Sequence, residues 1–344
     1  LAQAGIDTSR VTVRPLAHGL SPAVTDGAFS FRISEPCQLS IEPGGSLLHP
    51  LHLFANPIEK DPPDPEDPKV HYFGPGEHSI RDVMLTEGET MYVAGGAVVH
   101  LLPQTKDALG EPHSLYGQNL TTIGTMVEGK WTKNITLRGR GILCGRRALA
   151  RNQRGGHIRI QGVDGLTVEG LILRECSGWS LNIVNCRNVH VDGVKVVGHY
   201  VNNDGIVVGG TSEALVENCF SHNADDSLEV KAWIPQRNVL VRHCVVWNSV
   251  GGSLGLMHET GADVTNVVYE DCTVNGKISN VLFRNIRILS CRNTDVVIMA
   301  DGPESGIRNV TFENVLINGT PLRPGDPRLK TNAWVADVKV ISPE

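Results

Sequence analysis

Three aspartates occupy places in the sequence where they could do chemistry together. Asp225 and Asp226 are adjacent, and Asp204 stands at the matching place one repeat earlier in a repeating sequence. If the repeats stack as neighbouring strands, about 4.8 Å apart, the three carboxyl groups come together. Carboxylates this close repel one another, so we expect at least one of their pKa values to rise. A protonated acid beside an ionised base is an arrangement that hydrolyses glycosidic bonds.

Two other roles for these aspartates have to be weighed. Aspartate is common at the turns of solenoids, where it hydrogen-bonds to the backbone, and carboxylates with turn carbonyls suit Ca²⁺. Stacked like charges would destabilise a coil that had no use for them, so the arrangement favours catalysis. We predict Asp204, Asp225 and Asp226 as catalytic residues, with no metal. The sequence has no Walker loop, dinucleotide fingerprint or zinc-binding spacing, so we also expect no cofactor.

The elements that would position these aspartates follow from a repeated pattern. Copies with alternating apolar and polar residues start at positions 134, 165, 188, 213, 238, 266, 280 and 309. Alternation with period two indicates strands, and copies about 25 residues apart have the length of one coil of a solenoid. The interval between the copies at 266 and 280 is too short for a coil, which suggests that residues are missing near 275–277.

The repeats predict an all-β fold, a right-handed single-stranded parallel β-helix preceded by a small N-terminal β-sandwich. Leucine-rich horseshoes need helices that the repeats lack, and propeller blades need about 40 residues. Residues 1–68 contain short alternating strands and a proline-rich acidic stretch, so we expect the sandwich and a linker there and the β-helix over 69–344. Three cysteines share one inward column of the repeat, where they would fill the core as small apolar groups. They are Cys219, Cys244 and Cys272.

Aligning the second strand of successive repeats predicts which residues stack. One shared column contains Leu181, Ile206, Leu228 and Leu254. Two positions earlier, just before each strand, the column contains Trp179, Asp204, Asp226 and Gly252. The alignment therefore places Asp204 directly over Asp226, with Asp225 beside them.

The aspartates resemble the catalytic signature of polygalacturonases. Residues 202–205 read Asn-Asn-Asp-Gly and are followed by the adjacent pair at 225–226, which is similar to the family's Asn-x-Asp and Asp-Asp motifs. Residues 176–179 resemble the family's tryptophan-bearing coil. The related dextranase and isopullulanase family shares the three aspartates and has an N-terminal β-sandwich. The resemblance covers about residues 70–320 and implies a glycoside hydrolase of the pectin-lyase-type β-helix superfamily.

This resemblance implies hydrolysis with inversion in a single displacement. Asp225 would be the general acid, and Asp204 and Asp226 would hold and activate the attacking water. Where the family has Gly-His-Gly, residues 250–253 read Val-Gly-Gly-Ser, and His258 could replace the histidine or lie on the surface. The family's Arg-Ile-Lys, which would bind a uronate carboxylate, is expected near 275–277 and is not visible there.

Five residues are candidates for substrate binding: Asn203, Lys231, Trp179, Trp233 and His258. Asn203 could orient Asp204 or the sugar, and Lys231 could contact substrate, lower an aspartate pKa or lie on a solvated face. Trp179 and Trp233 could stack against sugar rings, although Trp233 could equally pack a loop. Glu229 alternates to the other face of its strand, and the sequence suggests no role for it.

The predicted substrate is a polysaccharide or oligosaccharide, either of the pectic polygalacturonan type or an α-glucan of the dextran or pullulan type. A polysaccharide lyase and a non-catalytic carbohydrate-binding β-helix are the alternatives. The net charge of −6 gives no basic footprint for nucleic acid, and no apolar run is long enough to span a membrane. The substrate class predicts secretion or a periplasmic location, with any signal peptide outside this sequence. The oligomeric state stays open.

Overall fold

The computed structural model describes residues 10–342, apart from 27, 46–49, 81–82, 103–116, 124–130, 147–154, 177, 201, 249, 257, 275–277, 289–293 and 301–305. The chain forms two compact units. The larger, which we call the β-helix unit, comprises Ser34–Gln38 and Phe54–Val274. The second unit comprises Leu1–Ile33, Leu39–Leu53 and Asn275–Glu344.

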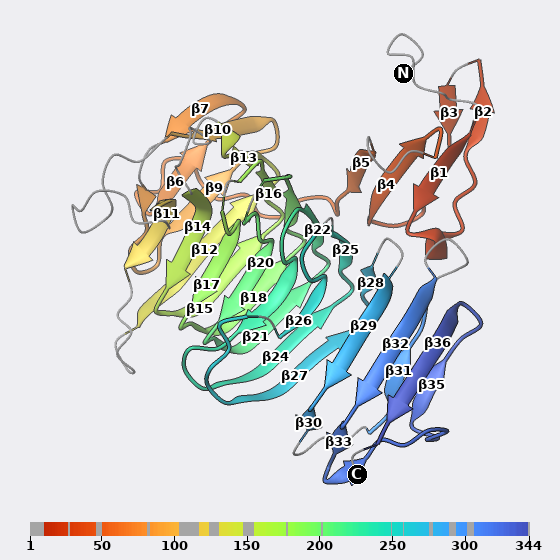
Figure 1. Ribbon diagram of the computed structural model, residues 1–344. Helices are drawn as coiled ribbons and strands as arrows, with labels where there is room; N and C mark the ends of the chain where they lie inside the picture. The colour runs from red at the N-terminus through yellow and green to blue at the C-terminus, as the bar shows by residue number, and fades with distance from the viewer. Residues whose placement is uncertain are drawn as a thin grey trace. The chain divides into compact units, whose positions relative to one another are not determined.

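The β-helix unit is a right-handed parallel β-helix with three sheets, and each coil adds one strand to each sheet (Figure 1). The first sheet contains β6 (Val70–Phe73), β9 (Thr90–Val93), β12 (Thr132–Gly139), β15 (Val163–Glu169), β18 (Arg187–Asp192), β21 (Ser212–Glu217), β24 (Gln236–Arg242) and β27 (Val264–Glu270). The second contains β7 (Gly76–Ile80), β10 (Ala97–Leu101), β13 (Ile142–Cys144), β16 (Ile172–Arg174), β19 (Lys195–Val197), β22 (Phe220–Asn223), β25 (Val245–Asn248) and β28 (Thr273–Val274). The third contains β8 (Val83–Met84), β11 (Gly117–Ile123), β14 (Gly155–Gln161), β17 (Leu181–Val184), β20 (Ile206–Gly209), β23 (Leu228–Lys231) and β26 (Leu254–Leu256). The predicted fold class is confirmed.

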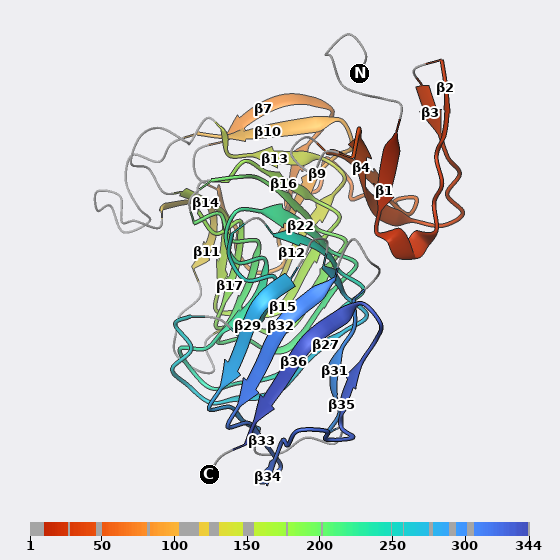
Figure 2. The same cartoon turned by 45° about the vertical axis from the view of Figure 1, so that its right-hand side comes forward.

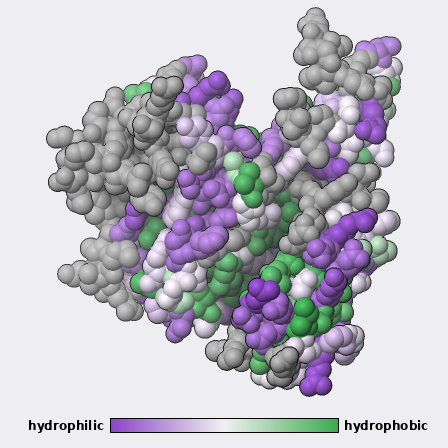
Figure 3. All heavy atoms as spheres, in the orientation of Figure 1, coloured by the Kyte–Doolittle hydropathy of each residue, from purple (hydrophilic) through white to green (hydrophobic). Residues whose placement is uncertain are grey.

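Strands of the second sheet, such as β7, β10, β13 and β16, lie one above the other when the molecule is turned (Figure 2). Among the described residues the only helix is a short 3-10 turn, Leu16–His18, and no helix is long and apolar enough to cross a membrane. Hydrophilic and hydrophobic side chains are interspersed over the surface seen in Figure 3.

The asparagine at the start of many repeats has a conformational reason. Asn188, Asn238 and Asn266 all have a positive φ, between 53° and 56°, a left-handed conformation that asparagine adopts more readily than most residues. Their side-chain amides also join neighbouring coils, since Asn266 Nδ2 donates to Asn238 Oδ1 at 2.6 Å. The repeat signature thus marks a residue with positive φ near the start of these three strands of the first sheet.

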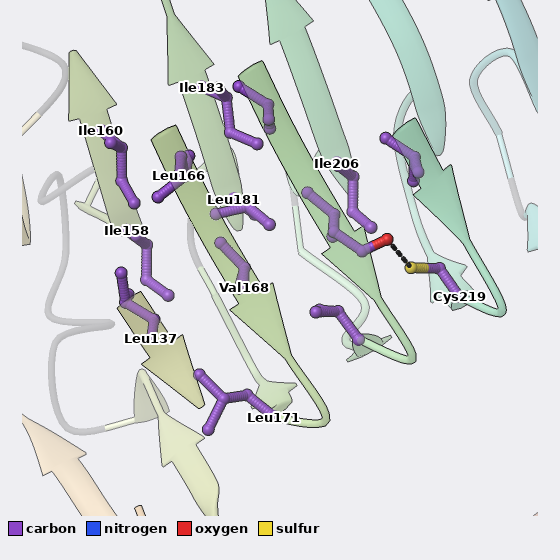
Figure 4. Packing of buried hydrophobic residues seen from close by; sticks show 14 of the residues in the cluster. Leu137, Ile158, Ile160, Leu166, Val168, Leu171, Leu181, Ile183, Ile206 and Cys219 are labelled. Atoms are coloured by element: carbon purple, nitrogen blue, oxygen red, sulfur yellow. Dashed lines mark hydrogen bonds between the residues drawn. The ribbon is translucent and has the colours of Figure 1, made fainter. Parts of the chain in front are cut away.

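The interior of the β-helix unit is a ladder of aliphatic side chains on neighbouring strands (Figure 4). Leu181 pairs with Ile206, which pairs with Leu228, which pairs with Leu254, so the predicted column is confirmed. The cysteine column is also confirmed, because Cys219 and Cys244 are buried in this core and Cys272 packs against it. Each thiol lies against a backbone carbonyl rather than a metal-ligand set.

The second unit combines the N-terminal strands with the C-terminal strands. The N-terminal sheets contain β1 (Val11–Arg14), β4 (Cys37–Pro43) and β5 (Leu51–Ala55), and β2 (Ala23–Thr25) with β3 (Ala28–Ser30). The C-terminal sheets contain β29 (Ile278–Arg284), β32 (Ile307–Glu313) and β36 (Val335–Ile341); β30 (Arg287–Ile288), β33 (Leu316–Ile317) and β34 (Thr320–Pro321); and β31 (Val296–Ile298) with β35 (Leu329–Thr331). The suspected gap at 275–277 lies outside the described residues, where the two units divide.

Candidate active site

The three aspartates lie on stacked loops that each precede a strand of the third sheet. Asp204 precedes β20, and Asp225 and Asp226 precede β23. The loops are tied to each other by backbone hydrogen bonds, from Gly205 N to Asp226 O (2.8 Å) and from Ser227 N to Gly252 O (2.9 Å). The register of the strands therefore continues into the loops, as the alignment predicted.

Asn223, at the end of β22, fixes the loop that carries the aspartate pair. Its side-chain nitrogen donates to the carbonyls of Asn203 (2.7 Å), Asp225 (2.7 Å) and Asp226 (2.9 Å). Its side-chain oxygen accepts from the hydroxyls of Ser221 and Ser227, each at 2.7 Å. The residue is fully buried. Sequence reasoning missed it, although its place just before the aspartate pair was a signal.

The glycines at 251 and 252 allow the next coil to approach the pair closely. A Cβ on Gly251 would lie 2.5 Å from Asp226 N and 2.6 Å from the carbonyl carbon of Asp225, too close for any side chain. Gly252 N donates to Asp226 Oδ1 at 2.6 Å. One oxygen of Asp226 is thereby held by a backbone N–H.

The structure brings Asp204 and Asp226 together and adds Glu229, with one carboxylate oxygen of each within 4.8 Å of the others. All three residues are at most 9% exposed. Asp225 is partly exposed, and its Oδ1 accepts a hydrogen bond from Asp226 N at 3.0 Å. The cluster thus has two buried aspartates and a more accessible one beside them.

Glu229 is the residue of this cluster that sequence reasoning passed over. Alternation correctly directs Leu228 and Val230 into the core and Glu229 away from it. The loops with the aspartates lie on that same outer side, so facing away from the core means facing the cluster. Lys231, two residues along β23, faces it too.

Lys231 supplies positive charge to the cluster. Its Nζ lies 3.4 Å from Asp204 Oδ2, 3.3 Å from Glu229 Oε2 and 3.0 Å from Glu259 Oε2. It also lies 4.1 Å from the centre of the Trp179 ring, a cation–π distance. Burial alone would lower the pKa of Lys231, but the carboxylates, Glu229 first, outweigh it and raise the pKa. The oxygens could converge on a divalent cation, but this ammonium already lies among them.

The buried carboxyls have perturbed pKa values. Burial is the main cause that raises the pKa of Asp204 to about 6, and Asp225 and Asp226 add to it, while Lys231 and a hydrogen bond with Glu229 oppose it. Burial, followed by the charge of Asp204, raises the pKa of Glu229 to about 10. Burial thus disfavours the charged form of both carboxyls, and of Glu229 more strongly.

The two tryptophans stack on one another near Lys231. The ring centres of Trp179 and Trp233 lie 6.3 Å apart and their planes differ by 16°. Trp233 lies over Gly209, where a Cβ would come within 2.3 Å of the indole. Trp233 is 39% exposed, so its ring packs the loop and still presents a surface to solvent.

The last two candidates differ in their surroundings. Asn203 is fully buried, and its Nδ2 donates to Ser180 Oγ at 3.0 Å, so its described contacts hold the loop of Asp204. His258 is exposed in the turn after β26. The neighbouring Glu259 provides the contact from this turn to Lys231.

The three stacked sheets place the chain among the right-handed parallel β-helix proteins. The buried carboxyl cluster on the outer side of the third sheet is a site suited to acid–base chemistry on carbohydrates. Residues 142–325, which include the whole cluster, match the model of glycosyl hydrolases family 28. The chain belongs to this family and is a glycoside hydrolase whose substrates are polysaccharides. The resemblance to polygalacturonases is confirmed. Members of the family are typically extracellular.

Solved structures of similar fold have low sequence identity. A polygalacturonase from Erwinia carotovora ssp. carotovora is 15% identical over 74% of this chain and 86% of its own, with a TM-score of 0.49. Dex49A from Penicillium minioluteum is 12% identical over 97% of this chain and 79% of its own, also with a TM-score of 0.49. PfbA, a surface adhesin of Streptococcus pneumoniae, is 10% identical over 78% and 82%, with a TM-score of 0.39. No curated protein sequence matches the chain.

Proposed function

We propose that the chain hydrolyses an O-glycosidic bond with inversion, using Asp225 as general acid and Asp204 with Asp226 to hold and activate the water. The observation that carries this proposal is the stacking of Asp204 on Asp226, whose oxygens lie within 4.8 Å of each other and of Glu229, with Asp225 adjacent in the same loop. Neighbouring carboxylates in a buried site repel one another and cost stability, so their presence favours a functional role.

The different exposures of the aspartates support their different roles. The general acid must reach the oxygen of the scissile bond, and Asp225 is more accessible than Asp204 or Asp226. The base must be ionised when water attacks, and Asp204, with its pKa raised to about 6, is a stronger base than an ordinary aspartate and still ionised at pH 7. Gly252 N holds Asp226 in a fixed orientation.

The surroundings of Lys231 favour a neutral sugar beside Asp204. Its ammonium is shared by the carboxylates of Asp204, Glu229 and Glu259. A uronate carboxylate at this point would meet these negative groups instead of a free cation. Of the two predicted substrate types, the surroundings of Lys231 support the α-glucan over the polygalacturonan at this subsite.

The same lysine argues against the lyase alternative. A lyase needs a base close to the α-proton of a uronate, and a lysine serves this purpose when its pKa is lowered. The pKa of Lys231 is raised instead, because the acidic side chains around it, those of Glu229, Glu259 and Asp204, stabilise its charged form. A non-catalytic binding helix would have no need for this buried charge.

Three expectations from the sequence are retained as part of the proposal. The size of a polysaccharide favours secretion or a periplasmic location. Residues 1–68 are proposed to form an N-terminal module distinct from the β-helix over 69–344, although residues 275–344 group with the N-terminal strands in the compact units. Lys231, Trp179, Trp233, Asn203 and His258 remain candidates for substrate contact.

The test is reducing-end release from polygalacturonate, rhamnogalacturonan, dextran and pullulan by the wild-type chain and by Asp225→Asn. We expect release by the wild type and a loss of about 10²–10⁴-fold in the variant, the usual contribution of a general acid. Asp271→Asn, in an exposed turn with a φ of 48°, is the matched control and should be fully active. NMR of the first product should show the inverted anomer.

An equal rate in wild type and Asp225→Asn would remove Asp225 from the mechanism. Retained anomeric configuration would exclude single displacement. Silence of the wild type on every substrate, with binding intact, would instead favour the non-catalytic carbohydrate-binding helix.

A further inference from the structure

Glu229 is buried among charged groups, and Lys231 Nζ, 3.3 Å from its Oε2, forms an ion pair with it but no hydrogen bond. The residue is 2% exposed, and among the described residues neither of its oxygens accepts a hydrogen bond. Asp204 Oδ1, on the preceding coil, is buried and lacks a donor as well. Unsatisfied buried acceptors are costly, so two neighbouring carboxyl groups with three oxygens that accept no hydrogen bond, even from Lys231, point to a missing proton.

We infer that Glu229 is a positioning residue which keeps a proton at neutral pH and donates it in a hydrogen bond to the ionised carboxylate of Asp204. The catalytic consequence of this inference rests on the proposed hydrolysis. A shared proton satisfies both carboxyls at once. It also keeps Asp204 in a fixed orientation toward the water that it is proposed to activate.

The charges around the pair require such a proton. Asp226 from its own loop, Glu259 from the turn after β26 and Lys231 on β23 face Glu229 and Asp204, and Tyr269 on β27 packs nearby. If all the carboxyls were ionised, the single ammonium of Lys231 would face four negative charges in a buried site. Protonation of one carboxyl relieves this repulsion.

The geometry selects Glu229 as the protonated member. Lys231 Nζ donates a hydrogen bond to Asp204 Oδ2, which stabilises Asp204 as the anion, whereas at 3.3 Å from Glu229 Oε2 it makes an ion-pair contact without a hydrogen bond. The Glu229 side chain has no exposed surface, whereas that of Asp204 is 4% exposed. Burial disfavours the charged form most where solvent is excluded most.

Two substitutions separate a proton donor from a structural contact. Glu229→Gln keeps an N–H donor toward Asp204 and an oxygen toward Lys231, as the protonated acid does. Glu229→Met keeps a comparable size and removes both. We expect kcat to fall by less than about tenfold in the first and by about 10- to 100-fold in the second, the value of a hydrogen bond to a charged group. Glu270→Gln and Glu270→Met, exposed on β27, are the controls.

The pH profile gives a readout that a structural role would not move. Donation from Glu229 lowers the pKa of Asp204, so its loss in Glu229→Met should shift the acid limb of kcat upward by about one pH unit. Glu229→Gln should leave that limb near its wild-type position. Equal profiles and equal rates in both variants and the wild type would overturn the inference.

A second measurement does not depend on activity. Because the pKa of Glu229 is raised in the folded chain, the stability that this proton contributes is complete below the ordinary pKa of glutamate and is lost as pH rises. Glu229→Gln removes this loss, so its thermal midpoint should gain on the wild type between pH 5 and pH 8. A difference in thermal midpoint between Glu229→Gln and the wild type that stays constant with pH would show that Glu229 is ionised and overturn the inference. Activity of Glu229→Gln as low as that of Glu229→Met would overturn it as well.

These measurements also distinguish failure of the inference from failure of the proposed function. If the wild type hydrolyses nothing, the proposed hydrolysis fails, while the unfolding series still decides the protonation of Glu229. If the wild type hydrolyses a substrate but both Glu229 variants match it, the hydrolysis stands and the positioning role falls.

Discussion

The two faces of the third-sheet strands follow different rules. Toward the core, successive coils present the aliphatic column Leu181, Ile206, Leu228 and Leu254. On the outer face of the same strands, the paired residues change chemistry at every coil: Asn182, Val207, Glu229 and Gly255. The inner face repeats because each coil must bury the same width of core, whereas the outer face has no such constraint. In these strands the face with the same residue type in every coil stabilises the fold, and the face with changing residue types contains the proposed site.

The largest expected effect tests the inner face. Leu228→Ala, at 1% exposure, should cost about 2–5 kcal/mol of the free energy of unfolding, since it leaves a cavity in a packed ladder. Leu256→Ala, on the neighbouring β26 but 51% exposed, should change it by less than about 0.5 kcal/mol. Urea unfolding of both variants measures the difference. Leu256 pairs with the core-facing Val230, so equal costs would contradict burial as the source of the stability of the inner face.

An intermediate effect is expected at the loop between the two faces. Asn223→Ala removes the side-chain donor to the carbonyls of Asn203, Asp225 and Asp226 and the acceptor of two buried serine hydroxyls, which should cost about 1–3 kcal/mol of stability. The rate of hydrolysis should fall as well, because the aspartate pair is no longer fixed. Thr265→Ala, exposed on β27, should change neither quantity. A stability loss with unchanged kcat would show that Asn223 does not position the pair.

The smallest effect is expected on the hydrolysis rate of the unmutated chain when the pH is lowered and Asp204 becomes protonated. Asp204 must be ionised to act as a base and its pKa is raised to about 6. The rate should therefore hold near pH 7 and fall below pH 6, approaching about tenfold per pH unit. Initial rates between pH 4 and pH 8, with circular dichroism to verify folding, test this. A rate that stays constant down to pH 4.5 would mean that Asp204 titrates as an ordinary aspartate.

The fold could be predicted because its determinants are periodic. The pattern that puts Leu181 over Ile206 also fixes the stacking of Asp204 on Asp226, since the loops between the strands keep the same register. Glu229 could not be predicted in the same way. Its importance depends on a lysine two residues further along β23 and an aspartate on the previous coil, and alternation alone gives only the side on which a residue lies.

Contacts across loops of irregular length were also beyond the sequence. His258 was the predicted contact from its turn, but Glu259 is the residue that meets Lys231, because a turn does not preserve a strand's periodicity. In the second unit, Ile286 occupies the position of the repeat that contains Cys219 and Cys244 in other coils, yet it is 39% exposed. It precedes β30, which is an edge strand of its sheet, so one of its sides has no neighbouring coil.

The asparagines with left-handed backbone conformation at the starts of successive coils also affect how such a chain can evolve. Several coils begin at their own Asn, as at Asn188 and Asn238, and the side-chain amide of this residue joins the coil to the preceding one. The start of a coil is therefore specified within that coil and its immediate neighbour. Single outer-face residues can then be substituted, or whole coils duplicated, without changes in the packing of the other coils. New sugar specificities therefore require few mutations.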